Sequence, residues 1–288
     1  MTPSLRGILL MVAAVGTFVL MDTVAKYLTR WYPTPLIVWA RYASNLAVLL
    51  AFLAARGELG LLRTARPGLQ FARGLLLALA TLLFFTSLSV LPLADANAIG
   101  FAMPLFVAAL AVPMLGERLE MARLLAILAG LAGALFIVRP GSDLFTPYAL
   151  LPLGMAVCNA LYQILTRKVA GLEPPLTSLV WGAIVGAVLL SVIAPFVWVS
   201  PQAVSHGVLI VVIGILASIG HFLLIRAYDY ASATLLVPFT YSALVWAMLL
   251  GWLVFGDFPD GWSLVGMGII VVSGLYLANR QRLTVRKE

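Results

Sequence analysis

Charged side chains are scarce in this chain. Asp, Glu, Lys and Arg make up 10% of its 288 residues, whereas 63% of the residues are hydrophobic. Typical soluble domains contain about 25% charged residues. Between Pro174 and Ile225 there is no residue of these four types, and that stretch is long enough to cross a hydrocarbon core twice at about 20 residues per helix. The composition excludes a soluble globular domain and predicts a polytopic membrane protein.

Cysteine and histidine are also rare. Cys158 is the single cysteine, so the chain cannot form an internal disulfide, and a Cys-ligated metal site is not expected. The two histidines, His206 and His221, do not form an HExxH motif. We therefore expect no metal and no cofactor. The net charge of +7 comes from basic residues at segment ends, not from a stripe interleaved with aromatics, so the expected partner is the lipid bilayer and not nucleic acid.

The chain has, instead, ten hydrophobic segments joined by short connections that contain proline. Long apolar runs favour helices over barrel strands, in which polar and apolar residues alternate. The first segment has spanning length and no small-residue cleavage site after it, so we interpret it as a retained helix and not as a signal peptide. The expected helices cover residues 7–28, 35–55, 72–90, 93–115, 122–138, 148–169, 176–199, 206–228, 232–255 and 262–279.

The basic residues are distributed unequally between the two sides of these segments. Positive residues in short loops stay on the cytoplasmic side of a membrane. Fourteen of the eighteen Lys and Arg residues fall on the side of the N-terminus, three fall on the other side, and Arg41 lies within a segment. The distribution predicts a multi-pass protein of a bacterial cytoplasmic (inner) membrane with both termini in the cytoplasm.

The ten segments form two groups of five that resemble each other at an offset of 140 residues. At this offset Gly74 matches Gly214, and Glu117 falls on Asp257. Because five is an odd number, the second group must enter the membrane from the side opposite to the first. Such inverted repeats occur in secondary transporters, where the substrate site lies between them near the bilayer midplane.

The fourth segment and its exit, residues 94–119, read ADANAIGFAMPLFVAALAVPMLGERL, in which a Pro-Leu-Phe run precedes Gly-Glu-Arg-Leu. Here the chain resembles the drug/metabolite transporter superfamily, and within it the ten-helix exporters built from two EamA-type repeats. The second copy departs from the pattern, because Pro238 comes earlier and Asp257 replaces the usual acid. The resemblance implies an all-α polytopic membrane protein whose ten transmembrane helices form two inverted five-helix repeats around a central cavity. The expected repeats are residues 1–140 and 148–279, followed by a basic cytoplasmic tail, 280–288.

The resemblance also implies that the fifth and tenth helices pack outside the cavity. Both segments carry small residues at helical spacing, which lets helix backbones approach closely. We favour packing within one chain over a dimer interface and expect a monomer or a weak homodimer. These residues are Ala126, Gly130 and Gly133 in the fifth segment, and Gly266, Ile270 and Gly274 in the tenth.

Ionisable residues at membrane depth cost about 2.5–3.5 kcal/mol each on insertion scales, so each one requires a partner or a water-filled cavity. Asp22 and Lys26 share a face of the first segment, and Arg41 enters the second segment from the same side. One interpretation is an outer gate where Arg41 or Lys26 binds a substrate carboxylate and Asp22 binds its ammonium group. The alternative is a salt-bridge cluster that joins helices. The full group is Asp22, Lys26, Arg41, Asn45 and Asp95.

Other polar and aromatic residues lie deeper and are expected to line the substrate cavity. Phe101 and Tyr241 correspond at the 140-residue offset, so inverted symmetry predicts that they face each other across a midplane cavity. His221 is either a proton carrier or a neutral side chain packed between helices. The expected cavity residues are Thr81, Asn97, Phe101, Pro104, Asn159, Tyr162, Gln163, His221, Pro238, Tyr241 and Ser242.

These features predict a secondary transporter that exports small amphipathic metabolites by alternating access. A cavity of aromatic, amide and hydroxyl groups with few charges suits amino acids, including aromatic ones. Drug or quaternary-cation efflux is the alternative within transport. An intramembrane enzyme is less favoured, because we find no nucleophile with a base, no metal cluster and no carboxylate pair at the midplane. A channel would differ by showing high diffusive flux without saturation.

Overall fold

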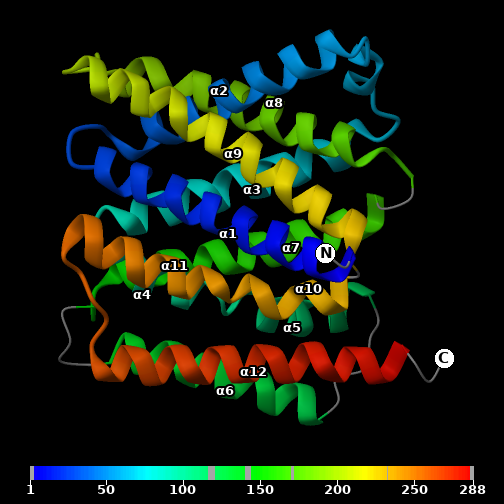
Figure 1. Cartoon of the computed structure of the whole chain (residues 1–288), viewed down its shortest axis with the longest axis vertical. Coiled ribbons are helices and arrows are strands. Elements are labelled where there is room, and N and C mark those ends of the chain that lie inside the picture. Colours follow the sequence, from blue (N-terminus) through cyan, green and yellow to red (C-terminus); the bar gives the residue numbers. More distant parts are fainter. Residues whose placement is uncertain (1–2, 116–120, 140–143, 170–171, 232, 286–288) are drawn as a thin grey trace.

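The computed structural model describes residues 3–115, 121–139, 144–169, 172–231 and 233–285, and in these ranges the chain is helical and contains no strand (Figure 1). The Gly-Glu-Arg-Leu motif lies outside the described residues. The α-helices are α1 (Pro3–Leu28), α2 (Thr34–Ala55), α3 (Pro67–Leu88), α4 (Leu93–Gly100), α5 (Met103–Leu115), α6 (Met121–Ile137), α7 (Leu150–Val169), α8 (Pro175–Ile193), α9 (Val204–Tyr230), α10 (Ala233–Thr240), α11 (Ser242–Leu250) and α12 (Gly261–Val285). Short 3₁₀ turns cover Leu59–Leu62, Pro147–Ala149 and Ala194–Val197, and a π-turn, Gly251–Phe255, extends α11.

Eight stretches in the described ranges are long and apolar enough to cross a membrane, and α6 and α12 contain shorter apolar helices, 124–137 and 261–276. The prediction of an all-helical polytopic membrane protein is confirmed. Helix α3 begins at Pro67, earlier than expected, because a proline in the first turn of a helix loses no hydrogen bond. Helix α12 continues to Val285, so the expected tail begins as helix and not as an extended segment.

Two of the expected spans are broken helices. The fourth span divides into α4 and α5 at Phe101, and the ninth divides into α10 and α11 at Tyr241. Pro104 lacks the N–H that would bond the carbonyl of Gly100, which explains the first break. Phe101 (φ −67°, ψ −1°) and Tyr241 (φ −67°, ψ −11°) have nearly the same backbone conformation. The two repeats therefore break at equivalent positions.

Helix contacts follow the expected two-fold relation between the halves. Helix α1 packs against α9, and its counterpart α7 packs against α3. Likewise α2 packs against α9, and its counterpart α8 packs against α3. Helices α2 and α8 pack on each other, as do α6 and α12, which lie together at one extreme of the long axis (Figure 1). Each of these contacts thus has a symmetry mate, as an inverted repeat requires.

Close backbone approach explains the small residues of α6 and α12. A Cβ at Gly133 would lie 2.8 Å from the carbonyl oxygen of Gly266, and a Cβ at Gly266 would lie 2.5 Å from that of Gly133. The two glycines are therefore in contact within one chain. Helices α1 and α12 begin and end, respectively, at the same end of the bundle (Figure 1). We call this the terminal end and the opposite one the far end.

Candidate functional site

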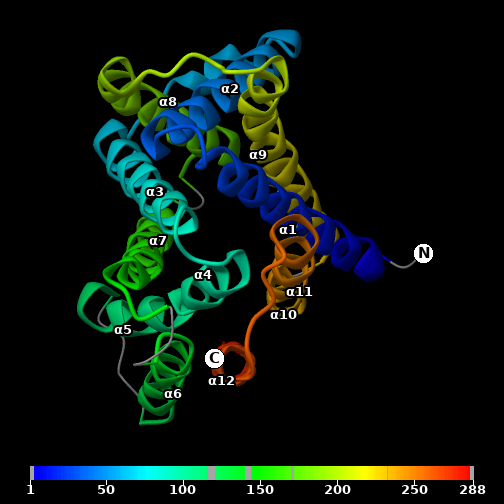
Figure 2. The same cartoon turned by 90° about the vertical axis from the view of Figure 1, so that its left-hand side faces the viewer.

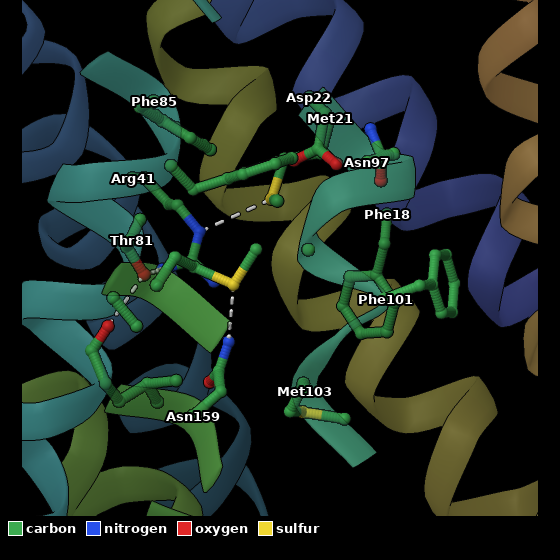
Figure 3. Close-up of a pocket in the computed structure, with 15 residues that line it drawn as sticks. Phe18, Met21, Asp22, Arg41, Thr81, Phe85, Asn97, Phe101, Met103 and Asn159 are labelled. Atoms are coloured by element: carbon green, nitrogen blue, oxygen red, sulfur yellow. Dashed lines mark hydrogen bonds between the residues drawn. The ribbon is translucent and has the colours of Figure 1, made fainter. Parts of the chain in front are cut away.

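A cavity of about 270 Å³ lies inside the bundle (Figure 3). Its volume is close to the lower end of the range of about 300–1,000 Å³ that is typical of small-molecule sites. Helices α1 to α5 and α7 supply its walls, so the first repeat provides most of the lining. The lining residues are Phe18, Met21, Asp22, Arg41, Leu77, Ala80, Thr81, Phe84, Phe85, Asn97, Gly100, Phe101, Met103, Met155 and Asn159.

Arg41 is the basic side chain of the cavity, and it is 6% exposed. Its Nη1 donates to Oγ1 of Thr81 at 3.3 Å, and its Nε lies 3.4 Å from Sδ of Met21. The guanidinium also lies 4.8 Å from the ring centroid of Tyr42. A hydroxyl and a thioether are neutral acceptors, and a thioether is a weak one, so the five N–H donors of Arg41 retain capacity for an anionic ligand.

Asp22 places a carboxyl group in the same cavity and is 7% exposed. Arg41 is the charged residue that acts on it electrostatically. Within the described ranges no hydrogen bond or ion pair reaches the Asp22 carboxylate. Figure 3 shows the two side chains entering the cavity from α1 and α2. The cavity therefore contains one basic and one acidic side chain that are not hydrogen-bonded to each other.

The rest of the wall is aromatic and thioether-rich. Phe18, Phe84, Phe85 and Phe101 contribute rings, and Met21, Met103 and Met155 contribute sulfur atoms. Nδ2 of Asn159 lies 3.0 Å from Sδ of Met155, and Nδ2 of Asn97 donates to the carbonyl of Leu93 at 3.0 Å. Both amides keep acceptor oxygens. Flexible methionines adapt to ligands of varied shape, and aromatic faces suit planar or cationic groups.

Asp22 and Arg41, which were predicted for an outer gate or charge cluster, both line the cavity. Lys26, one turn beyond Asp22, remains at the far end. Its Nζ donates to the carbonyls of Leu91 at 2.7 Å and Leu88 at 3.3 Å, at the C-terminus of α3. Asp257 lies 3.9 Å from the same nitrogen. Lys26 thus joins α1 to the end of α3 and to the segment after α11.

Asp95 and Asn45 are also structural in this conformation. Asp95 is 3% exposed at the far end, where its side chain bonds Ser263 of α12, and its Oδ1 has no hydrogen-bond partner in the described ranges. Oδ1 of Asn45 accepts a 2.8 Å hydrogen bond from Ser218 of α9. Arg139 bonds Asp260 nearby, and this bond holds the pKa of the Asp260 carboxyl below its ordinary value.

Of the eleven expected cavity residues, Thr81, Asn97, Phe101 and Asn159 line the cavity. The other seven do not line it, and α9, α10 and α11 contribute no lining residue in the described ranges. Nδ1 of His221 lies 2.8 Å from the carbonyl oxygen of Ala217, and its ring is edge-on to Phe18. Gln163 and Pro238 are exposed, and Nε2 of Gln163 lies 3.1 Å from Sδ of the cavity-lining Met103. Pro104 is half-buried in α5, and Ser242 bonds the carbonyl of Phe239. Tyr162 bonds Arg73, and Tyr241 is buried behind Phe101.

Phe101 and Tyr241, the residues at the two helix breaks, contact each other directly, whereas the repeat offset predicted that they would face each other across the cavity. Their ring centroids are 5.0 Å apart with an interplanar angle of 30°. On the far side of this contact α4 packs against α11. On the terminal side α5 packs against α6 and α7, whereas α10 packs against α1 and α12, and Figure 2 shows α5 and α10 well separated. The bundle is therefore closed at the far end and splayed at the terminal end.

A buried polar network joins the two repeats at the terminal end. Arg73, which is 3% exposed, donates to Gln70 at 2.6 Å and to Thr166 of α7 at 3.0 Å. Gln70 in turn donates to Glu173 in the connection between α7 and α8. Hydrogen bonds, that from Thr64 being the strongest influence, hold the pKa of the Glu173 carboxyl below its ordinary value of 4.5. The network fixes the start of α3 to α7 and to this connection.

Most of the phenylalanine and methionine residues that line the cavity were not predicted from the sequence. Helical spacing offered one usable signal, because Phe18 lies four residues before Asp22 and Leu77 lies four before Thr81. Phe85 likewise follows Thr81 by four. For the methionines we find no comparable signal, since a methionine in an apolar helix looks the same whether it faces lipid or a cavity.

Comparison with known proteins agrees with this architecture. The model of the EamA-like transporter family matches the chain twice, over residues 5–139 and 146–280. The chain is 29% identical to the riboflavin transporter of Vibrio cholerae, over 99% of the chain and 96% of that protein. It is 29% identical to the S-adenosylmethionine uptake transporter of Rickettsia bellii (93% and 91% covered) and 30% identical to the pseudopaline exporter of Pseudomonas aeruginosa (96% and 97% covered).

A solved crystal structure shares the fold, with a TM-score of 0.65 and 24% identity over 97% of this chain and 98% of that one. The two family matches cover both halves of the chain, and the relatives are named as transporters or exporters. These names point to transport and not to an enzyme. The chain belongs to the EamA-like transporter family and is a multi-pass membrane transporter.

Proposed function

We propose that the chain exports small zwitterionic metabolites, most notably amino acids, across the cytoplasmic membrane by alternating access. The observation that carries this proposal is the pair of Arg41 and Asp22 in one cavity, each with bonding capacity left over. A guanidinium binds a carboxylate through two parallel hydrogen bonds, and a carboxylate binds an ammonium group. An α-amino acid carries both groups, so it matches the charges of the cavity.

The remaining wall matches the variable part of such a substrate. Phenyl rings and thioethers accept apolar or aromatic side chains without demanding one shape. The cavity, at about 270 Å³, suits a molecule of amino-acid size more than a large conjugate. The relatives are named for riboflavin, S-adenosylmethionine and pseudopaline, of which S-adenosylmethionine contains an α-amino-acid group, the part that Arg41 and Asp22 would bind.

The charge distribution of the sequence supports a cytoplasmic location for the terminal end. In that orientation the splayed end faces the cytoplasm and the closed far end faces outward. In this conformation the cavity would bind substrate from the cytoplasm, as an exporter must before it releases the substrate outside. Release requires the far end to open, and the bonds of Lys26 to Leu88 and Leu91 would break in that step.

Counterflow in proteoliposomes tests the substrate class. In each assay, vesicles are preloaded with one unlabelled compound, and the same compound is added outside in labelled form. The compounds are an amino acid, a quaternary cation, riboflavin, S-adenosylmethionine and a nucleotide sugar. We expect saturable accumulation of amino acids and its loss in Arg41→Ala. Arg56→Ala is the matched control, because Arg56 is exposed and bonds Glu58 outside the cavity. Accumulation of riboflavin or a nucleotide sugar without any amino acid would overturn the proposal.

Efflux of quaternary cations is a second candidate with an observation of its own. Asp22 faces the cavity together with Phe18, Phe84 and Phe85, and a carboxylate among aromatic faces favours a cation. The two candidates differ in their need for Arg41. A cation exporter should retain or gain flux in Arg41→Ala and lose it in Asp22→Asn, whereas amino-acid transport should fall in both variants.

A further inference from the structure

Tyr241 connects the helix break of the second repeat to α12. The residue is 8% exposed and lies between the end of α10 and the start of α11. Its hydroxyl lies against Gly274 of α12. A Cβ at Gly274 would overlap that hydroxyl and would lie 2.8 Å from the ring carbon Cζ. Glycine at this position therefore provides the space in which the Tyr241 hydroxyl sits.

Tyr241 also contacts the cavity wall, through its ring. The Tyr241 ring stacks on Phe101 at 5.0 Å, and Phe101 lines the cavity while Tyr241 does not. Phe101 sits between α4 and α5, where the helix ladder is interrupted, so its position depends on side-chain contacts more than on a regular helix. A displacement of the Tyr241 ring would disturb its contact with Phe101 and so change the shape of the cavity wall.

We propose that Gly274 and Tyr241 are positioning residues that set the size of substrate the cavity accepts. In this arrangement α12, which contributes no lining residue in the described ranges, acts on the cavity through the chain of contacts Gly274, Tyr241 and Phe101. The inference rests on the proposed function, because it assigns size selectivity to the cavity proposed for transport. It concerns the shape of the wall and not the charged groups that bind the substrate.

Two alanine substitutions on the same helix test this inference. Gly274→Ala adds a methyl group against the Tyr241 hydroxyl. Gly268→Ala is the matched control, since none of the described residues lies within 4 Å of the place where its Cβ would be. In Gly274→Ala we expect the KM for tryptophan and phenylalanine to rise about tenfold, the change that corresponds to about 1.4 kcal/mol. The KM for alanine and the Vmax for alanine should stay near the wild-type values, and Gly268→Ala should resemble wild type for all three.

Rescue separates positioning from general damage. Adding Tyr241→Phe to Gly274→Ala removes the hydroxyl that the new methyl group would meet, so the KM for tryptophan should fall back towards wild type. An equal rise of KM for large and small substrates, or no rescue, overturns the inference. If Gly274→Ala does not fold, the double variant decides: a folded protein whose KM for tryptophan is near the wild-type value supports the inference, and a protein that again fails to fold, or that folds with an equally raised KM for large and small substrates, overturns it.

A chemical measurement gives a result even if wild type transports no amino acid. Met103 lines the cavity, and a Met103→Cys variant is prepared in a Cys158→Ala background so that a single thiol remains. A bulky maleimide should label this thiol about tenfold more slowly with Gly274→Ala than with Gly268→Ala, whereas a small alkylating reagent should label both equally. Equal labelling by the bulky reagent overturns the positioning role. If the protein shows no amino-acid counterflow but Gly274→Ala still slows labelling by the bulky maleimide alone, the proposed substrate is overturned and the positioning role is not.

Discussion

Replacing Arg41 with alanine removes the guanidinium from the central cavity. Its two contacts with protein acceptors are a hydroxyl at 3.3 Å and a thioether at 3.4 Å, so little hydrogen bonding within the protein is lost. Hydrogen bonds to charged groups contribute about 1.5–3 kcal/mol each. If the substrate carboxylate binds Arg41, the loss of one such bond should raise the half-saturation concentration roughly 10- to 150-fold, since 1.4 kcal/mol is about tenfold.

Arg41→Lys sharpens the prediction. A lysine keeps the positive charge but lacks the planar fork that holds a carboxylate through two bonds. We expect an effect between those of wild type and Arg41→Ala. Half-saturation is measured by counterflow of a labelled amino acid, and thermal unfolding is followed in the same detergent to report stability. The control Arg56→Ala should change neither quantity by more than a small amount, because exposed ion pairs contribute about 0–1 kcal/mol.

The reasoning is refuted if Arg41→Ala unfolds the protein or lowers its melting temperature greatly while the folded fraction transports normally. That result would identify Arg41 as part of a structural cluster with Asp22, whose disruption by removal of one buried charge costs about 3–5 kcal/mol. It would equally be refuted if Arg41→Ala folds and shows an unchanged half-saturation concentration for every amino acid. A fall in amino-acid transport with wild-type stability supports direct binding.

Three further predictions follow from contacts outside the cavity. Lys26→Met should destabilise the far end by about 1–3 kcal/mol, because the carbonyls of Leu88 and Leu91 lose their donor, and should increase thiol labelling from outside at that end. Glu173→Gln should lower the melting temperature at pH 7, and its difference from wild type should shrink as the pH falls below 4.5: the folded-state pKa is depressed below 4.5, so the stabilisation is present above that value and is lost as the pH falls through the folded-state pKa. Gly133→Ala should cost about 1–3 kcal/mol in unfolding free energy, because its methyl group would meet the Gly266 carbonyl.

Each of these predictions has a control. Lys26→Arg keeps a cation near the carbonyls of Leu88 and Leu91, so its stability and thiol labelling should stay close to wild type. An equal defect in Lys26→Met and Lys26→Arg would contradict the role of these hydrogen bonds in closing the far end. For Glu173 the same substitution at Glu58, in an exposed pair with Arg56, should give little change, and a pH-independent defect of Glu173→Gln would argue against the carboxylate. For Gly133 the control is Gly268→Ala, and equal stability of the two variants would show that the α6–α12 contact tolerates a methyl group.

Much of the helical framework could be predicted because hydrophobic length and proline placement are local signals. The helix boundaries agree with the expected spans to within a few residues for most segments. The repeat offset paired Phe101 with Tyr241, although their rings meet in direct contact and not across the cavity. Asp22 and Arg41 were recognised as unusual from their charge alone.

The cavity itself was less predictable. The lining comes mainly from one repeat, so the symmetry that places Phe101 opposite Tyr241 does not place His221 or Ser242 in the wall. Polarity was a poor guide because many polar side chains in the membrane satisfy themselves on their own helix. His221 meets the carbonyl of Ala217, and Ser242 bonds that of Phe239. Seven of the fifteen lining residues are phenylalanine or methionine, and for the methionines we find no sequence signal for a cavity.

The sequence by itself determined that this protein spans a membrane with helices arranged in two related halves. It did so because apolar length, charge scarcity and repeat spacing are properties of the chain and need no neighbours. Tertiary structure decided which residues share the cavity, which end of the bundle is closed, and that Gly274 seats Tyr241 behind Phe101. These features depend on helix tilt, on breaks in two helices and on contacts between residues far apart in the chain, and no local pattern encodes them.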